Sequence, residues 1–371
     1  MRAPVEIEGH SLRMLRDGRR VFPAMLDAIT SARRTICLEM YWVEDDVVGA
    51  RFRDALVAAS RAGVSVRVIV DAVGSFGLPE DFWAPLEAVG GRARVFRPLS
   101  VTAAAAALAR DHRKILVVDD ERAFVGGVNL AAQWLPISEG GENWRDTALE
   151  VRGPELPLAL RAVFDTTWHR FSPGQLQEPP APLVWTSAGG KLRVLANSPL
   201  RRQGRKIRQS YVRAIRRARY GIDLTAAYFA PRPSFIRSLH RAAQRGVRVR
   251  VLLPLKSDVL AMRLAAEPLA RLLATLGVEV YGYVGGVLHA KTAVVDGSWL
   301  TVGSHNLDAW SWLWNLECNV VVIDPAMGAR AVDMFEEDLR LSVRLAKGSI
   351  VPAGRLDGVV RRVIELWYGL G

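Results

Sequence analysis

A short polar pattern that occurs twice constrains this chain more than any other feature of its sequence. Histidine, lysine and aspartate recur with the same spacing in HRKILVVD at 112–119 and in HAKTAVVD at 289–296. Each copy is followed, at matching distances, by a pair of small residues and an asparagine: Gly126, Gly127 and Asn129 in the first, Gly303, Ser304 and Asn306 in the second. Two copies with matching downstream residues are far less expected by chance than one short match. The sequence therefore predicts two related half-sites.

The similarity between the two halves extends well beyond these motifs. AITSARRTICLEMYW from Ala28 resembles AIRRARYGIDLTAAYF from Ala214, and RAGVSVRVIVD at 61–71 resembles QRGVRVRVLLP at 244–254. Such a repeat indicates two copies of one structural unit, and 371 residues exceed what one hydrophobic core usually holds. We expect a first half at 1–171, a Pro- and Gly-containing linker at 172–191, a second half at 192–345 and a tail at 346–371.

Apolar periodicity predicts the strands and helices of each half. TICLEMYWV at 35–43 and VSVRVIVDAV at 64–73 have the composition of strands, and the spacing of Val48, Phe52 and Leu56 predicts a helix between them. Strands that alternate with helices are typical of parallel sheets covered on both faces. We therefore expect an α/β fold of two similar halves, each with a mixed, largely parallel sheet flanked by helices.

Each motif has the pattern of a β-hairpin, in which ILVVD turns into AFVGG and TAVVD turns into WLTVG. Residues two apart on a strand point to the same face, so each motif histidine shares a face with the lysine that follows it. Asp119 and Asp296 end their strands. We expect these two motif members to stabilise the hairpins rather than to contact substrate.

Two imidazoles and two ammonium groups are suited to reaction at a phosphodiester. One neutral imidazole can attack phosphorus to form a phosphohistidine, and the other can protonate the leaving oxygen and later deprotonate the incoming hydroxyl. Lys114 and Lys291 can hold the phosphoryl oxygens without a metal, and the groups expected to assist them are Asn129, Asn306 and backbone N–H groups near Gly127 and Ser304. We predict no cofactor and no metal. His305, next to Asn306, is a further candidate for contact with substrate.

These residues resemble the phospholipase D superfamily and, more narrowly, the bacterial cardiolipin synthases. The resemblance extends from about residue 10 to residue 345 and includes, besides the two motifs, the segments LEMYWVEDDVVG, GVSVRVIVDAVGS, NWRDTALEVRGP and NLECNVVV. It implies one active site where the two halves meet, with His112 as nucleophile and His289 as acid and base, although the symmetry of the sequence does not decide this order. It also implies that Asp146 supports His289 and that Glu317 supports His112.

The resemblance implies a transferase that moves a phosphatidyl group from one phosphatidylglycerol onto histidine, releases glycerol, and passes the group to a hydroxyl of a second phosphatidylglycerol. The alternatives are phosphodiesterases of the same superfamily that hydrolyse phospholipid or nucleic acid. The net charge of +12 favours an anionic partner of either kind. Because the aromatic residues are not interleaved with the basic clusters as base-stacking platforms are, we expect phospholipid and no nucleic acid.

We also expect peripheral contact with the cytoplasmic side of the inner membrane. The sequence has no signal-peptide pattern, and its longest apolar run, at 101–109, is well short of the roughly 20 residues that cross a bilayer. This is similar to the shorter synthases, which lack membrane-spanning N-terminal segments. The candidate lipid contacts are that run, the tryptophans at 310, 312 and 314, the tail, which has the pattern of an amphipathic helix, and the basic cluster Arg201, Arg202, Arg205, Lys206 and Arg208.

Overall fold

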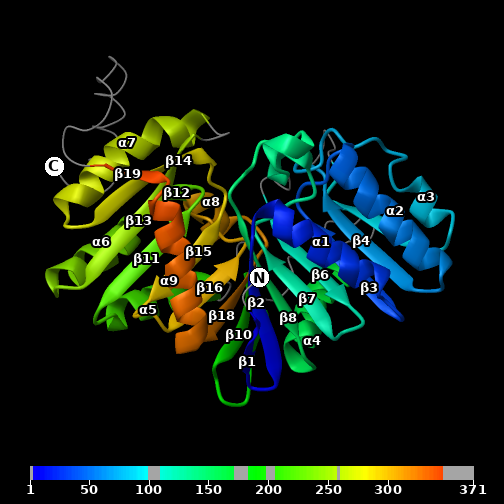
Figure 1. Ribbon diagram of the computed structural model, residues 1–371, viewed down its shortest axis with the longest axis horizontal. Coiled ribbons are helices and arrows are strands. Elements are labelled where there is room, and N and C mark those ends of the chain that lie inside the picture. The colour runs from blue at the N-terminus through cyan, green and yellow to red at the C-terminus, as the bar shows by residue number, and fades with distance from the viewer. Residues whose placement is uncertain (1–2, 99–108, 171–182, 198–204, 257–259, 346–371) are drawn as a thin grey trace. The chain divides into compact units, whose positions relative to one another are not determined.

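The computed structural model describes residues 3–98, 109–170, 183–197, 205–256 and 260–345 (Figure 1). The chain divides into two compact units. The first contains the described residues up to 207 together with 302–305 and 313–321, and the second contains 208–301, 306–312 and the residues from 322 on. Besides the described residues of 192–207, two short segments from the second half of the sequence therefore belong to the first unit.

An eight-stranded sheet forms the centre of the first unit. Its strands are neighbours in the order β1-β2-β8-β7-β6-β3-β4-β5. Their bounds are Val5–Ile7 (β1), His10–Arg16 (β2), Thr147–Arg152 (β8), Arg122–Gly126 (β7), Lys114–Val118 (β6), Thr35–Met40 (β3), Ser65–Asp71 (β4) and Arg92–Phe96 (β5). β3, β4 and β5 pair in parallel, and all the other neighbours pair antiparallel.

The expected mixed α/β class is confirmed, but the parallel part of this sheet is smaller than the sequence suggested. β3 and β4 are parallel because helix α2 (Val47–Arg61) carries the chain back between them. β6 and β7 form the hairpin expected of the first motif, and a hairpin adds antiparallel strands. The alternation of strands and helices indicates the parallel part, whereas the pairing of β6 with β3 is a long-range contact that the alternation does not reveal.

Helices of the first unit cover the buried strands. α1 (Asp17–Thr30) and α2 pack against each other and lie side by side in Figure 1. The expected stripe on α2 is buried, including Val48, Phe52 and Leu56, and the Asp46 carboxylate caps the start of the helix. α4 (Glu155–Arg170) contacts β3, β6, β7 and β8. The remaining elements of this unit are α3 (Ala84–Glu87), 3₁₀ turns at Ala132–Trp134 and Ile137–Glu139, and the antiparallel pair β9 (Leu183–Thr186) and β10 (Leu192–Asn197).

The second unit repeats the central arrangement of the first. Five of its strands are neighbours in the order β19-β14-β13-β11-β15, with bounds Ser342–Arg344 (β19), Glu279–Val287 (β14), Arg248–Lys256 (β13), Gly221–Ala226 (β11) and Lys291–Val295 (β15). β11, β13 and β14 pair in parallel, and β15 joins β11 antiparallel. The helices of the second half are α5 (Lys206–Arg217), α6 (Pro233–Gln244), α7 (Leu260–Thr275), α8 (Ala309–Leu313) and α9 (Pro325–Leu339).

Four further strands complete the second half of the sequence. The short strands β12 (Phe229–Ala230) and β17 (Leu307–Asp308) pair in parallel within the second unit. β16 (Trp299–Gly303) and β18 (Glu317–Ile323) each contain residues of both units. The second expected hairpin therefore begins in the second unit, at β15, and ends in the first.

Strand direction decides which loops lie near the motif histidines. β6 runs antiparallel to β3, with Met40 opposite Lys114, so the residues before β6 lie at the edge where β3 and β4 end. β7 ends and β8 begins at the same edge. In the second unit β15 runs antiparallel to β11, with Ala226 opposite Lys291. Each motif therefore begins beside the loop that follows a central strand.

Most of the candidate lipid contacts lie outside the described residues: 101–108, Arg201, Arg202, the side chain of Trp310 and the tail at 346–371. The first part of the expected linker, 172–182, also lies outside them, and its last part contains β9. Trp312 is buried, with its ring centroid 5.5 Å from that of Phe235, which identifies it as a core residue rather than a membrane anchor. Among the described helices, none is both long and apolar enough to span a bilayer.

Candidate active site

The imidazole of His112 lies against a carboxylate from the second half of the sequence. Its Nδ1 is 3.1 and 3.2 Å from the two carboxylate oxygens of Glu317, the first residue of β18. The backbone N–H of His112 also donates to the carbonyl of Leu316 at 3.0 Å. Both side chains are buried. A carboxylate at Nδ1 favours the tautomer that carries its proton there, and Nε2 then has a lone pair for chemistry.

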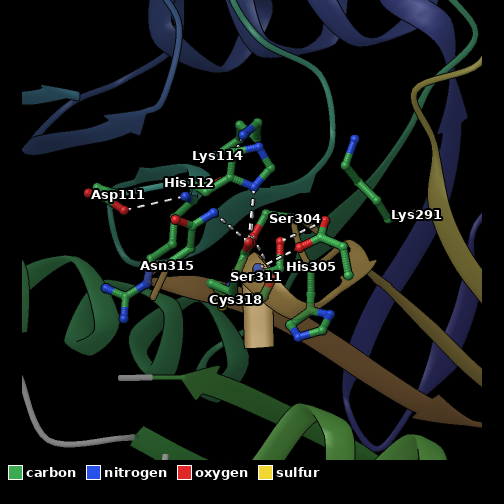
Figure 2. Close-up of polar contacts among 12 residues, drawn as sticks. Asp111, His112, Lys114, Lys291, Ser304, His305, Ser311, Asn315 and Cys318 are labelled. Atoms are coloured by element: carbon green, nitrogen blue, oxygen red, sulfur yellow. Dashed lines mark hydrogen bonds and ion pairs between the residues drawn. The ribbon is translucent and has the colours of Figure 1, made fainter. Parts of the chain in front are cut away.

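Glu317 is held in turn by neighbours within the first unit, two of which, Ser304 and Asn315, are labelled in Figure 2. The Ser304 hydroxyl donates to one carboxylate oxygen, and Asn315 Nδ2 donates to the other at 3.4 Å. The backbone N–H of Cys318 donates to the Ser304 hydroxyl at 3.1 Å. The Ser304 side chain therefore orients the carboxylate that orients His112.

Lys114, the first residue of the buried strand β6, lies beside His112. Its Nζ donates to the carbonyl of His112 at 2.7 Å and lies 4.8 Å from the centroid of the Tyr41 ring. The same ring is 4.8 Å from the imidazole of His112, centroid to centroid, at an interplanar angle of 66°. Tyr41 directly follows β3, so the sheet edge described above brings it to the motif.

The loop that carries His112 is attached to the ends of β4 and β5. Asp71, the last residue of β4, lies 3.0 Å from Nε of Arg110 through both carboxylate oxygens and accepts the backbone N–H of Asp111 at 2.8 Å. Arg110 also donates to the carbonyl of Phe96 at 3.1 Å. Asp71 and Arg110 are not among the residues predicted from the sequence. In the sequence, Asp71 is an acid at the end of an apolar strand and Arg110 is an arginine in a loop. Both features are too common to indicate a site.

A buried cluster of charged and polar groups includes the residues on both sides of His112. Arg113 lies 3.4 Å from the carboxylate of Glu39, which also accepts a 2.9 Å hydrogen bond from the hydroxyl of Thr167. Burial, together with the charge of Glu39, raises the pKa of Asp111 well above its usual range. The raised pKa of Asp111 favours its neutral form, and this limits the cost of burying the cluster.

Gly127 and Asp146 form a close contact at the same sheet edge. A Cβ at position 127 would lie 2.2 Å from a carboxylate oxygen of Asp146, so any other residue there would force that carboxylate to move. That carboxylate accepts the indole N–H of Trp134 at 3.0 Å and the backbone N–H of Thr147 at 2.7 Å. Gly127 thus makes room for the acid in the first half, whereas Ser304 bonds to the acid in the second. The expected pairing of Asp146 with His289 stays a prediction.

The backbone N–H groups of Gly127 and Ser304 themselves are used within the sheet. They donate to the carbonyls of Thr147 and Cys318, each at 3.1 Å, because both residues continue the pairing of neighbouring strands. Asn129 is buried, and its Oδ1 accepts the backbone N–H of Trp42 at 3.3 Å. Only other N–H groups of these loops remain for phosphoryl oxygens.

The second unit contains the matching histidine and lysine. Lys291 Nζ lies 3.0 Å from Nδ1 of His289 and also donates to the carbonyl of the same residue. The ring of Tyr228 is 6.2 Å from the imidazole of His289 and 6.0 Å from the ammonium of Lys291. His289, Lys291 and Asn306 are all buried in this unit.

The two motif aspartates contact backbone at the far ends of their strands. The carboxylate of Asp119 accepts the N–H groups of residues 33–35 at 2.7 to 2.8 Å. The carboxylate of Asp296 accepts those of residues 219–221 at 2.7 to 3.2 Å. Each aspartate comes five positions after the lysine of its motif, a distance of about 17 Å along a strand at the usual rise. These contacts support a structural role and no contact with phosphorus.

His305 is fully buried in the first unit. Burial lowers the pKa of its imidazole to about 4, although the charge of Glu317 acts in the opposite direction. A neutral ring with no solvent exposure is a poor candidate for direct contact with substrate. The sequence does not reveal this burial. The position of His305 next to Asn306 in the motif instead suggests contact with substrate.

Comparison with known proteins identifies the family. The family model described as a cardiolipin synthase, phospholipase D-like domain matches residues 25–168 and 211–339. The probable cardiolipin synthase YwiE of Bacillus subtilis (strain 168) is 30% identical over 364 residues, which are 97% of this chain and 72% of that protein. Cardiolipin synthase B of Escherichia coli (strain K12) is 33% identical over 333 residues, 85% of this chain and 77% of that protein.

A solved structure shares the fold at much lower sequence identity. The crystal structure of phosphatidylserine synthase from Haemophilus influenzae Rd KW20 matches with a TM-score of 0.75 and 13% identity, over 97% of this chain and 93% of that chain. The family model matches most of both halves, and both synthases are matched over more than two thirds of their own length. This chain therefore belongs to the cardiolipin synthase family of phospholipase D-like proteins.

Proposed function

We propose that this protein is a phosphatidyltransferase that joins two phosphatidylglycerol molecules into cardiolipin and releases glycerol. One observation carries the proposal: the carboxylate of Glu317 at Nδ1 of a buried motif histidine, His112, whose Nε2 is thereby prepared for attack. The similarity to cardiolipin synthases over most of the chain supports the choice of phospholipid as substrate.

In the first step, Nε2 of His112 attacks the phosphorus of one phosphatidylglycerol. The bond between phosphorus and the headgroup oxygen breaks as the phosphorus–nitrogen bond forms. Protonated His289 gives its proton to the departing oxygen, and glycerol leaves. The enzyme then holds the phosphatidyl group as a phosphohistidine.

In the second step, the now neutral His289 removes the proton from a hydroxyl of the second phosphatidylglycerol. The resulting oxygen attacks phosphorus, and the bond to His112 breaks. Cardiolipin is released, and both histidines return to their starting states. Lys114 and Lys291 balance the negative charge that collects on the phosphoryl oxygens, so we propose that no step requires a metal ion.

We further propose that the enzyme works at the cytoplasmic surface of the inner membrane, without crossing it. The positive net charge of +12 supports attraction to anionic lipid.

The two halves at 1–171 and 192–345, joined by the linker at 172–191, remain our proposal for the domain organisation.

The test is product analysis with the purified protein and vesicles of phosphatidylglycerol. Thin-layer chromatography should reveal cardiolipin, and an enzymatic assay should detect about one glycerol per cardiolipin formed. The matched control is the His112→Ala protein. Phosphatidic acid as the main product would make the enzyme a hydrolase, and cleavage of DNA with no lipid product would make it a nuclease.

A further inference from the structure

An aromatic ring lies against both members of the His–Lys pair in each half-site. In the first unit, the Tyr41 ring is 4.8 Å from the imidazole of His112 and 4.8 Å from Nζ of Lys114. In the second, the Tyr228 ring is 6.2 Å from the imidazole of His289. It is 6.0 Å from the ammonium of Lys291. The same three kinds of group therefore meet twice.

The two tyrosines reach these places from different positions along the chain. Tyr41 is one residue beyond Met40, the partner of Lys114 across the β3–β6 pair. Tyr228 is two residues beyond Ala226, the partner of Lys291 across the β11–β15 pair. A simple copy of an ancestral residue would keep the same register. The repeated contact from unequal positions indicates that the contact itself has a use.

The contacts are also selective for the motif lysines. Arginine makes many cation–π contacts in this protein, as it commonly does. Within the part of the chain that the structure describes, the lysine contacts of this kind are those of Lys114 and Lys291. Both tyrosines are half-buried, whereas the two lysines are buried.

The face of a phenol ring attracts a cation without neutralising it. The attraction is strongest where water is excluded, as it is around these buried ammonium groups. A carboxylate in the same place would hold the lysine more tightly but would cancel the charge that the phosphoryl oxygens need. An aromatic ring thus suits a lysine that must be both fixed in place and fully charged.

We propose that Tyr41 and Tyr228 are positioning residues, whose ring faces hold the ammonium groups of Lys114 and Lys291 in place and restrict rotation of the adjacent imidazoles. The inference rests on the proposed function, because it requires that these pairs act on phosphorus. It assigns the effect to the aromatic face, so the hydroxyl is not needed.

The first test compares side chains of similar size with and without an aromatic face. Tyr41→Phe should retain kcat within about twofold, and Tyr41→Leu should lose about 3- to 30-fold, mainly in kcat, because the ammonium acts on charge that develops in the transition state. Tyr228→Leu should lose less, about 2- to 5-fold, because its ring is more distant. The control is Tyr220→Leu, at a side chain that is 76% exposed. Its kcat should be unchanged.

A second test separates the aromatic face from mere packing. Phenylalanine with one, two or three ring fluorines is introduced at position 41, because fluorine weakens the negative face and changes the volume little. kcat should fall stepwise with each fluorine, while the thermal midpoint of unfolding stays constant. This series remains informative even if Tyr41→Leu fails to fold. A flat series, or Leu variants with full kcat, would overturn the inference.

The two proposals fail in different ways. If the wild-type protein hydrolyses phosphatidylglycerol instead of making cardiolipin, the proposed function is wrong, and the fluorine series is measured on the hydrolysis rate. If cardiolipin forms but kcat does not depend on ring fluorination, the function stands and the positioning role is refuted.

Discussion

At the residue scale, the decisive contact is between side chains 205 positions apart, His112 and Glu317. In the proposed mechanism, the carboxylate sets the tautomer of the imidazole and stabilises its positive charge when phosphorus is attached. Ser304 and Asn315 keep the carboxylate in place. The proposed nucleophile is therefore oriented by groups from the other half of the sequence.

Replacing Glu317 by glutamine tests this preparation. The amide keeps the size of the side chain but removes its charge and can present an N–H group to Nδ1. We expect kcat to fall about 100-fold or more with little change in KM, as measured by steady-state kinetics. Glu121→Gln, at a side chain 71% exposed, is the control and should retain full activity. A Glu317→Gln enzyme within tenfold of wild type would refute the role.

For His305 we predict an effect on the pH dependence of protein stability rather than on catalysis. Its pKa in the folded protein is about 4 because of burial, against an ordinary value of 6.5. Below pH 6.5 the unfolded chain therefore binds a proton at this residue that the folded protein does not bind, and stability falls as the pH drops toward 4. We expect His305 to account for a loss of about 2 kcal/mol between pH 7.5 and pH 5.

Urea unfolding of the wild-type and His305→Gln proteins at these two pH values measures that loss. The wild type should be more sensitive to acid than the variant by about this amount. His169→Gln, at an exposed histidine, serves as the control and should behave as the wild type does. Equal pH dependence in the His305→Gln protein would show that this imidazole does not stay neutral.

At the scale of elements, the two ends of the motif strands have separate tasks. The start of β6 presents His112 and Lys114 at the edge where β3 and β4 end, and the end of β6 carries Asp119 at the opposite edge. Asp119 has a left-handed backbone, with φ of 54°, and its carboxylate accepts the N–H groups that lead into β3. One end of the motif thus carries the histidine and lysine that we propose to act on phosphorus, and the other end carries an aspartate that bonds to backbone.

Asp119→Ala separates these tasks. Burial raises the pKa of Asp119, but the hydrogen bonds from backbone N–H groups outweigh it and leave the pKa below its ordinary value of 3.8. We expect the variant to lose about 1–3 kcal/mol of unfolding free energy at pH 7, with kcat of the folded protein retained. Because the folded pKa is lowered, the difference between the two proteins should shrink as the pH falls below about 4.

Chemical denaturation and kinetics on the same preparation measure both quantities. Asp296→Ala should behave in the same way, since its carboxylate accepts the corresponding N–H groups in the second unit. If Asp119→Ala were fully stable but lost most of its kcat, the aspartate would belong to the chemistry after all.

At the scale of the whole molecule, the duplication divides the proposed reaction between two histidines with different tasks. His112 has a carboxylate at Nδ1, whereas Nδ1 of His289 lies 3.0 Å from an ammonium. The carboxylate expected at His289, that of Asp146, stays a prediction, and so does the assignment of the nucleophile to the first half.

Single replacement of either histidine should abolish turnover. His112→Ala lacks the nucleophile and His289→Ala lacks the acid and base, so each should retain less than about a thousandth of the wild-type kcat. The proposed division of tasks can be tested by trapping the intermediate. After denaturation in detergent under mildly alkaline conditions, which preserve the acid-labile phosphorus–nitrogen bond, labelled phosphatidyl should stay on the protein at position 112 in the His289→Ala enzyme when a substrate with a good leaving group is used. Label at no position, or turnover above a tenth of wild type in either variant, would contradict the mechanism.

The family, the two half-sites and the mixed α/β class could be predicted from the sequence. Motif spacing and apolar alternation are local, and they set which side chains share a strand face regardless of the rest of the fold. Residues such as Asp71 and Arg110 could not be predicted, because an acid that ends a strand and an arginine in a loop are ordinary until the loop is known to fold back. The same holds for the extent of antiparallel pairing around β6.

By itself, the sequence determined that each motif has a histidine two residues before a lysine and that the lysine leads into a strand, since this needs only neighbouring residues. Only the tertiary structure decided what surrounds them: Glu317 at His112, Tyr41 at Lys114, and the N–H groups of Gly127 and Ser304 used for strand pairing. The physical reason is that each of these contacts depends on the order and direction of strands in a sheet. That order follows from the packing of the whole chain, which no local pattern contains.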